Sequence, residues 1–334
     1  CPIQIMNSSF DSNFDGVLNV ENRYDFNSLK GSALKWRQLA MPSPGSKSES
    51  EVVAQGTVNF PDIAARQSGT VSIPVFKPSA DVIQLTVIDR DGKELFTWSH
   101  RILGKERTVA KVSGAAPVWK EDGDMILVTA NGRTYRFSKA DGQLKGVDVN
   151  GRHIGLTDGP RVIVAKRSDR SMDGFYNHDD KEAEKKKTRY TEFDDAGTLV
   201  GVRAETVGEN VVVTADYKLG NFDKAVWTIA PDGSSVLDFT YNFNGVIDLM
   251  GVKFDFPEDK VLSKRWVGDG PYRVWQNRLH GPQYGVWEND YNDPIPAESF
   301  TYPEFKGYFA NVDWMDIRTK DGNIVIINET PDSY

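Results

Sequence analysis

Five side chains suited to binding a sugar stand close together late in the sequence. They follow a glycine- and proline-containing turn, and they are Trp275, Asn277, Arg278, His280 and Trp287. Aromatic rings pack on the apolar C–H faces of sugars, and amide, guanidinium and imidazole groups bind hydroxyls. Small-molecule sites commonly combine an apolar lining with a few placed polar groups. The segment therefore predicts a carbohydrate-binding site.

A structural interpretation of the same residues stays open. Tryptophan and tyrosine side chains are usually largely buried, so these aromatics would equally suit the core of a β-sandwich. In that case Arg278 would be a buried residue that pairs with a carboxylate such as Asp290 and fixes the loop.

The same residue types could also carry catalytic chemistry. Glycoside hydrolysis needs two carboxyl groups that flank the scissile bond, and mutarotation needs a histidine acid with a carboxylate base. The chain has four histidines, His100, His153, His178 and His280. His280 is the best candidate acid because it lies in the aromatic segment, but no partner acid is evident beside it. A binding or structural role is therefore favoured for His280, and we predict no catalytic residue.

Metal and cofactor sites are not predicted. The spacing of Cys and His residues fits no zinc site, and no glycine loop follows a strand and opens a helix. Residues 11–16, D-S-N-F-D-G, loosely resemble a calcium-binding loop, but Phe14 interrupts the pattern and Asn22 stands where a bidentate Glu is needed. A plain turn closed by aspartate side chains is the favoured interpretation.

The elements that position the candidate site are predicted to be β-strands. Val261–Val267 alternates between apolar and polar residues, and the Gly268-Asp269-Gly270-Pro271 sequence ends that strand in a tight loop. Strand-like runs separated by turn signals recur through the rest of the chain, and Asn131-Gly132 and Asp141-Gly142 are strong hairpin signals. An all-β fold is therefore predicted, with a boundary at the charged connector near residue 105. Residues 1–105 and 106–334 are the two expected domains.

Several motifs, in one order, resemble the C-terminal region of family 2 glycoside hydrolases of the β-galactosidase type. The family has a W-x-G-x-G-P strand end with an Asn or Asp before an Arg, matched here by Trp266, Gly268, Gly270, Pro271, Asn277 and Arg278. A later tyrosine–proline–acid element with a glycine, followed by a D-V-x-W strand, has its counterpart in Tyr302, Pro303, Glu304, Gly307, Asn311, Val312, Asp313 and Trp314. In the first domain, Asn22-Arg23-Tyr24-Asp25-Phe26 followed by Leu29 resembles the domain that follows the family's catalytic barrel.

The resemblance implies an immunoglobulin-like sandwich followed by a larger galactose-mutarotase-like β-sandwich. In the family this second domain continues past a point like Tyr334, so a truncated domain is implied. The catalytic carboxylate pair belongs to a barrel that would precede residue 1. The chain is thus expected to be a non-catalytic portion that supports the barrel of its parent, assembles subunits as a homo-oligomer or holds a galactoside or other glycan. One departure concerns residues 159–167, where the Gly-Pro of a sugar-contacting segment is present but its tryptophan is missing, which puts that contact in doubt.

Composition narrows the function classes. A net charge of −8 argues against nucleic acid as a partner, because phosphate backbones are bound by basic surfaces. No apolar run is long enough to span a membrane. The only cysteine, Cys1, is either the first residue of a fragment or the lipid-carrying residue of a stand-alone, exported carbohydrate-binding or mutarotase-like protein. The fragment is favoured, and its parent is expected to be a bacterial enzyme that is exported to the periplasm or cell surface.

Overall fold

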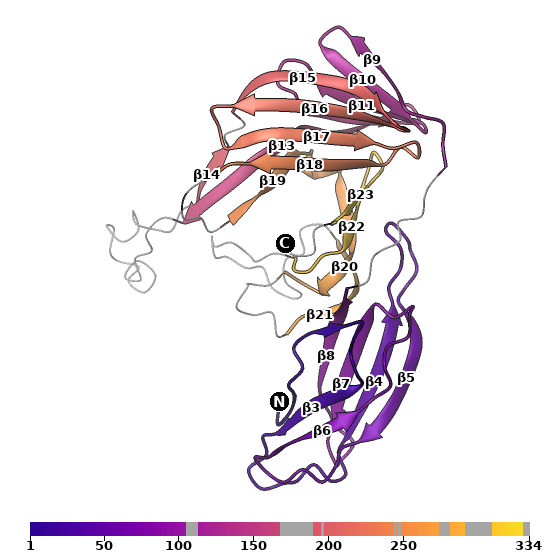
Figure 1. Cartoon of the computed structure of the whole chain (residues 1–334), viewed down its shortest axis with the longest axis vertical. Helices are drawn as coiled ribbons and strands as arrows, with labels where there is room; N and C mark the ends of the chain where they lie inside the picture. The colour runs from indigo at the N-terminus through magenta and orange to yellow at the C-terminus, as the bar shows by residue number, and fades with distance from the viewer. Residues whose placement is uncertain are drawn as a thin grey trace, which may run out of the picture. The chain divides into compact units, whose positions relative to one another are not determined.

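The computed structural model describes residues 1–104, 113–167, 190–194, 197–243, 245, 249–273, 281–290 and 309–329 (Figure 1). Regular structure in these residues is β-strand apart from one short 3₁₀ turn, η1, at Glu258–Lys260. The predicted all-β fold with sandwich-like domains is therefore confirmed. Within these ranges, no helix has the length and hydropathy needed to cross a membrane.

The chain forms two compact units, Cys1–Thr108 together with Val261–Tyr334, and Val109–Lys260. Each unit is a set of residues that pack compactly together, whether or not they are adjacent in the sequence. The predicted division of the chain at residue 105, with 106–334 as a single domain, stays a prediction.

The N-terminal part of the first unit is a two-sheet sandwich. One sheet has the order β1-β3-β6 and the other β2-β8-β7-β4-β5. The strands are β1 (Ile3–Ile5), β2 (Phe10–Asp11), β3 (Val17–Asn22), β4 (Ala33–Ala40), β5 (Glu51–Asn59), β6 (Ser68–Ser72), β7 (Val82–Ile88) and β8 (Glu94–Leu103). Alternating apolar residues from both sheets, such as Leu18, Val20, Leu34 and Leu85, fill the core between them.

The alternation in β3 also explains a buried polar residue. Leu18, Val20 and Asn22 point inward, as the period of two predicts. The Asn22 amide is fully buried and donates to the carbonyls of Asn27, Ile63 and Ala64 at 2.9, 2.9 and 3.0 Å. Since a buried amide is stable only when it is hydrogen-bonded, Asn22 fixes the loop that follows β3.

The turns in this sandwich follow local side-chain chemistry. The Asn13 N–H donates to Asp11 Oδ1 at 2.7 Å, and the Val17 N–H donates to Asp15 Oδ1 at 2.9 Å. Segment 11–16 therefore adopts the aspartate-closed turns that the sequence predicted.

The second unit packs two further sheets face to face. One has the order β14-β13-β12-β11-β10-β9, with β19 also paired to β13, and the other is β15-β16-β17-β18. Their strands are β9 (Val118–Asp122), β10 (Met125–Ala130), β11 (Arg133–Ser138), β12 (Leu144–Val149), β13 (Arg152–Arg167), β14 (Tyr190–Asp194), β15 (Thr198–Val207), β16 (Asn210–Lys218), β17 (Phe222–Ile229), β18 (Ser235–Tyr241) and β19 (Leu249–Asp255). The core between the sheets includes Val128, Phe137, Val211 and Trp227.

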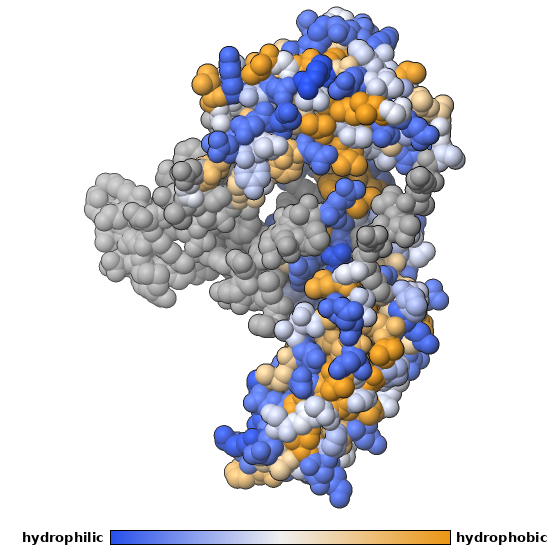
Figure 2. All heavy atoms as spheres, viewed as in Figure 1, coloured by the Kyte–Doolittle hydropathy of each residue, from blue (hydrophilic) through white to orange (hydrophobic). Residues whose placement is uncertain are grey.

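The outer surface of this unit is mixed in character. Apolar and charged side chains are interspersed over β15–β18 (Figure 2). This is the pattern of an antiparallel sheet with one face on the core and one in solvent. The predicted Asn131-Gly132 hairpin joins β10 to β11, with φ angles of 44° and 74° that suit the tight two-residue turn.

A four-stranded sheet completes the first unit, in the order β21-β20-β22-β23. Its strands are β20 (Val261–Gly270), β21 (Gln283–Asp290), β22 (Trp314–Thr319) and β23 (Asn323–Ile327). Val267, Tyr284 and Trp314 form a buried cluster with Leu39 and Val82 of the N-terminal sandwich. This cluster positions the strand end that carries the candidate site.

Candidate functional site

The end of β20 is shaped by two glycines that allow close approach. A Cβ atom at Gly268 would lie 2.9 Å from the Val312 Cα atom, so the 310–312 backbone passes directly over this residue. A Cβ atom at Gly270 would lie 2.5 Å from two atoms of the Trp287 ring. The peptide bond between Gly270 and Pro271 is cis, and the chain leaves the sheet there.

Trp287 is the one predicted binding residue within the described part of the chain. Its half-buried indole rests on Gly270 and donates from Nε1 to the carbonyls of Gly268 and Gln283, at 3.1 and 3.2 Å. The indole N–H is thus engaged in closing the β20–β21 hairpin. Trp275, Asn277, Arg278 and His280 lie outside the described residues, so their predicted proximity to Trp287 stays a prediction.

The tryptophans of the two strand motifs, Trp266 and Trp314, are core residues. Trp266 is fully buried, donates from Nε1 to the Asp269 carbonyl at 2.9 Å and packs on the Phe309 ring with centroids 4.7 Å apart. Trp314 is also fully buried and donates to the Pro42 carbonyl at 3.1 Å. Both side chains therefore serve the packing of the sheet.

Asp269 is a buried carboxylate at the mouth of the loop that sequence reasoning did not single out. Its Oδ2 atom accepts a hydrogen bond from Asn311 Nδ2 at 2.8 Å. Burial raises the pKa of Asp269, and the hydrogen bond from the neutral amide only partly opposes this effect. Such a group can accept from a hydroxyl when ionised or donate when protonated. Its signal in the sequence is its place between the two glycines.

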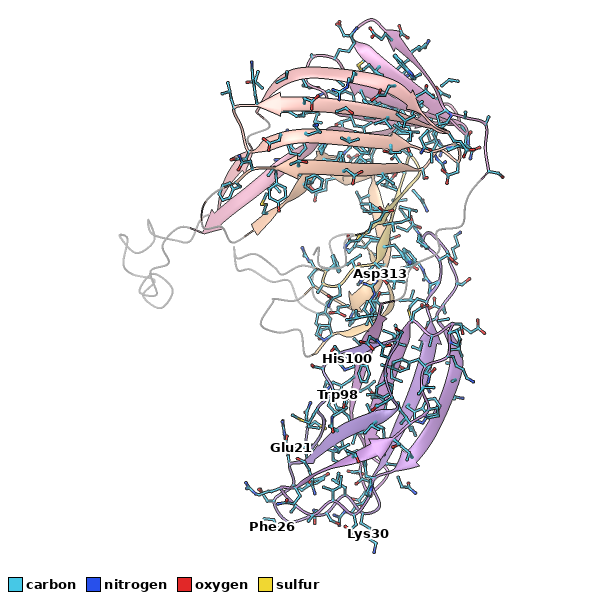
Figure 3. All side chains as sticks on the ribbon, viewed as in Figure 1. Glu21, Phe26, Lys30, Trp98, His100 and Asp313 are labelled. Atoms are coloured by element: carbon cyan, nitrogen blue, oxygen red, sulfur yellow. The ribbon has the colours of Figure 1, made fainter. Side chains whose placement is uncertain are left out.

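A second buried carboxylate, Asp313, joins two parts of the first unit. It pairs with Arg101 of β8, whose Nη1 atom is 3.0 Å from Oδ1, and its Oδ2 atom accepts from the Tyr284 hydroxyl. Arg101 follows Trp98 and His100 on β8, and these two residues are labelled with Asp313 in Figure 3. Asp313 therefore ties β8 to β21 and to the segment before β22.

Arg265 makes a third polar anchor on the same sheet. It is buried and donates to the Ser48 carbonyl at 2.7 Å and to the carboxylates of Glu49 and Glu288 at 3.0 and 3.2 Å. The cross-strand neighbour Asp316 is also buried, and burial raises the pKa of its carboxyl against the opposing effect of Arg318. Together these contacts hold segment 47–49, between β4 and β5, onto the sheet.

Two other histidines, His100 and His153, lie within the described residues. His100 is largely buried against Phe10, with ring centroids 5.2 Å apart, and burial lowers its pKa. The exposed His153 hydrogen-bonds through Nδ1 to Asp148 at 2.8 Å, and Arg136 binds the other oxygen of the same carboxylate. Burial raises the pKa of Asp148, but the hydrogen bonds from Arg136 and His153 outweigh it, so the net shift is downward. His178 lies outside the described residues.

Residues 159–167, where the family's tryptophan is missing, form part of strand β13. Gly159-Pro160 has a cis peptide bond within β13, and a Cβ atom at Gly159 would lie 2.3 Å from the Phe254 ring. Arg161 donates to Asp255 at 2.6 Å across the β13–β19 pair. Across the described ranges, no three His, Cys, Asp or Glu side chains are grouped as metal ligands would be.

Comparison with protein families gives two matches. The profile described as beta galactosidase small chain matches residues 129–330, and the one described as beta-galactosidase, domain 4, matches residues 18–102. No curated protein matches the chain. Segment 18–102 contains β4–β7 with most of β3 and β8, and segment 129–330 runs from the end of β10 through the sheet that carries the Gly270-Pro271 loop.

Proposed function

Since the chain belongs to the beta galactosidase small chain family, which matches more than half of its residues, we propose that it serves as a non-catalytic portion of a β-galactosidase-like glycoside hydrolase. In this role it supports a catalytic barrel of the parent enzyme and holds carbohydrate at the loop after Gly270-Pro271. The paired family matches, 18–102 and 129–330, are the observation that carries the proposal. Export to the bacterial periplasm or surface, and homo-oligomer formation, stay predictions.

The contacts of the buried carboxylates support the non-catalytic role. A glycosidase needs two carboxyl groups on either side of a bound glycosidic bond. Asp313 is paired with Arg101 and accepts a hydrogen bond from the Tyr284 hydroxyl, and Asp316 lies within the Arg265 and Arg318 cluster. These groups hold strands together, and their geometry is that of anchors for a sheet.

The rigid base of the loop supports carbohydrate binding there. The β20–β21 hairpin is closed by Trp287, and the buried Asp269 carboxyl, which accepts from Asn311, directly precedes Gly270. Binding residues placed at the ends of well-packed strands lose little freedom when a ligand binds. Arg278 and His280 are proposed to contact hydroxyls, with Trp275 supplying an aromatic face.

The proposed absence of catalytic activity is tested by an activity assay. Purified protein is assayed with chromogenic galactosides and related aryl glycosides, and turnover at the level of the buffer blank is expected. Turnover well above the blank that is lost on substitution of an acid in this chain would overturn the non-catalytic role.

The binding part is tested with Arg278→Ala and calorimetric titration of lactose. Loss of one hydrogen bond costs about 0.5–1.5 kcal/mol, or roughly 2- to 13-fold in affinity. The proposal expects weaker binding at an unchanged melting temperature. A strongly lowered melting temperature, with no lactose binding by the parent protein, would instead assign Arg278 to the core.

A further inference from the structure

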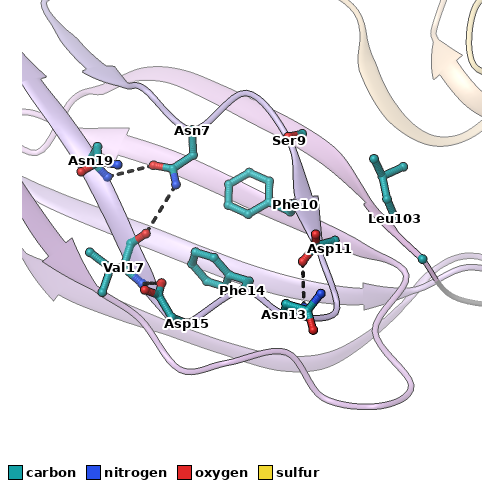
Figure 4. Close-up of a pocket in the computed structure, with 11 residues that line it drawn as sticks. Asn7, Ser9, Phe10, Asp11, Asn13, Phe14, Asp15, Val17, Asn19 and Leu103 are labelled. Carbon is teal, nitrogen blue, oxygen red and sulfur yellow. Dashed lines mark hydrogen bonds between the residues drawn. The ribbon is translucent and has the colours of Figure 1, made fainter.

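A cavity of about 800 Å³ opens on the N-terminal sandwich, on the side formed by segment 7–19 and the end of β8 (Figure 4). Its volume falls in the range of about 300–1,000 Å³ that is usual for small-molecule sites. It is lined by Asn7, Ser9, Phe10, Asp11, Asn13, Phe14, Asp15, Val17, Asn19, Leu103 and Gly104. None of these residues belongs to the sheet that carries the Gly270-Pro271 loop.

The half-buried Phe14 gives the cavity an aromatic wall, and Phe10, which is only 2% exposed, supports it from behind. Phe14 stacks on Phe76 with ring centroids 4.8 Å apart and an interplanar angle of 20°. Phe10 meets Phe14 edge to face at 5.2 Å and also packs against Phe76 and His100. Because these rings support one another, the wall is formed before any ligand arrives.

The polar side chains around the wall are fixed by bonds to the backbone. Asn7 accepts from the Asn19 N–H at 2.8 Å and donates to the Val17 carbonyl at 3.4 Å. Asp11 and Asp15 each use the Oδ1 atom to close a turn, which fixes the direction of the carboxylate and leaves Oδ2 for another donor. These are preorganised acceptors in the same cavity as the aromatic wall.

The charge of the lining selects among ligands. Among the residues that the structure describes, the lining has two carboxylates and no lysine or arginine, so it disfavours phosphate, sulfate and other anions. A divalent cation would want more oxygen ligands, and the described part of the chain places no third acidic or histidine side chain with Asp11 and Asp15. Neutral hydroxyl donors match both the acceptors and the aromatic face.

We propose that this cavity binds a neutral mono- or disaccharide, as a second carbohydrate site independent of the loop after Gly270-Pro271. Sugar hydroxyls donate to the Oδ2 atoms of Asp11 and Asp15, and a C–H face lies on the Phe14 ring. The proposal does not require the chain to bind carbohydrate anywhere else.

The test is an NMR titration of the full-length protein, labelled with ¹⁵N, with lactose. The reporters are the amides of Asn13, Val17 and Asn19, because each donates to a side chain of the cavity rim. We expect these signals to shift and saturate with lactose. Phe14→Leu removes the aromatic face, and Asp11→Asn with Asp15→Asn keeps the turn-closing Oδ1 atoms but removes both charges. Each variant is expected to weaken binding by about 5-fold or more, which corresponds to about 1 kcal/mol.

Three outcomes would overturn the proposal. The reporters could stay unmoved by lactose at tens of millimolar, or shift with calcium chloride in place of lactose. They could also shift equally in the wild type and in the Asp11/Asp15 double variant, whose turns are preserved. Trp287→Phe and Arg278→Ala are the controls for the other site. They should leave the reporter shifts unchanged, so that failure of either site is distinguished from failure of the other.

Discussion

At Gly270, the lack of a side chain is what allows the Trp287 indole to close the hairpin. A Cβ atom there would lie 2.5 Å from the indole ring, so Gly270→Ala must displace the tryptophan. Overpacking of this kind typically costs about 1–3 kcal/mol. We expect a correspondingly lower free energy of unfolding in urea, together with changed tryptophan fluorescence of the folded protein.

Gly281 is the matched control for this substitution. It lies near the other end of the same loop, and a Cβ atom there would meet no atom within 4 Å. Gly281→Ala should therefore change stability by less than about 0.5 kcal/mol. Equal effects of the two alanines would contradict the role assigned to the Gly270–Trp287 contact.

Asp269 makes stability depend on pH in a defined direction. Burial raises the pKa of its carboxyl, so the folded state holds the proton more tightly than the unfolded chain does. Such a group favours folding at low pH, and this contribution is lost as the pH rises through the raised pKa. Asp269→Asn keeps an acceptor for Asn311 without the charge. The variant should therefore gain stability relative to the wild type as the pH is raised from about 4 towards 8.

Thermal melts of the two proteins across this pH range measure the effect. Asp290→Asn is the control, since Asp290 is an exposed acid on the neighbouring strand β21. A difference between wild type and Asp269→Asn that stays constant with pH would show that the Asp269 carboxyl titrates as a solvated group.

At the scale of elements, an ion pair between Arg265 and Glu49 joins β20 to segment 47–49, and its two side chains differ greatly in exposure. The Arg265 side chain is 6% exposed, whereas that of Glu49 is 76% exposed. Removing the buried member takes the donor from the Ser48 carbonyl and leaves Glu288 with Arg318 as its partner, and an acceptor that loses its donor costs about 1–3 kcal/mol. Arg265→Ala should therefore be strongly destabilising.

Glu49→Ala removes only the exposed member of the same pair. Arg265 keeps its bonds to Ser48 and Glu288, so the cost should be below about 1 kcal/mol. Urea unfolding of both variants compares them directly. A Glu49→Ala cost as large as that of Arg265→Ala would mean that Glu49, rather than the burial of Arg265, holds the segment.

At the scale of the whole molecule, the two compact units have separate cores. Trp314 belongs to the cluster with Leu39 and Val82, whereas Trp227 belongs to the cluster with Val128 and Phe137. Truncation of a buried tryptophan to alanine costs about 3–5 kcal/mol. In calorimetry of the full chain, Trp314→Ala should lower one melting transition and Trp227→Ala the other. If either variant lowers both transitions together, the chain unfolds as one cooperative body.

Many strands and turns could be predicted because their signals are local. Alternation in β3 identifies the buried face, and Asn131-Gly132 supplies the positive φ angles that its hairpin needs. Strand β9 escaped prediction because all five of its residues, Val118–Asp122, are exposed and show no alternation. Strand β13 appeared shorter because Gly159-Pro160 resembles a turn, whereas a register shift between Thr157 and Arg161 accommodates it within the strand.

The sequence by itself determined the all-β class, the resemblance to β-galactosidase C-terminal regions and the glycine–proline end of β20. Only the tertiary structure decided that Arg101 meets Asp313 and that Arg265 reaches the Ser48 carbonyl. It also decided that aromatic residues of segment 7–19 form the wall of a cavity. The physical reason is that alternation records which face of a strand avoids water, but not which distant segment covers that face. A charge such as Asp313 is identical in sequence whether it is solvated or buried, and its role depends on the partner that packing brings to it.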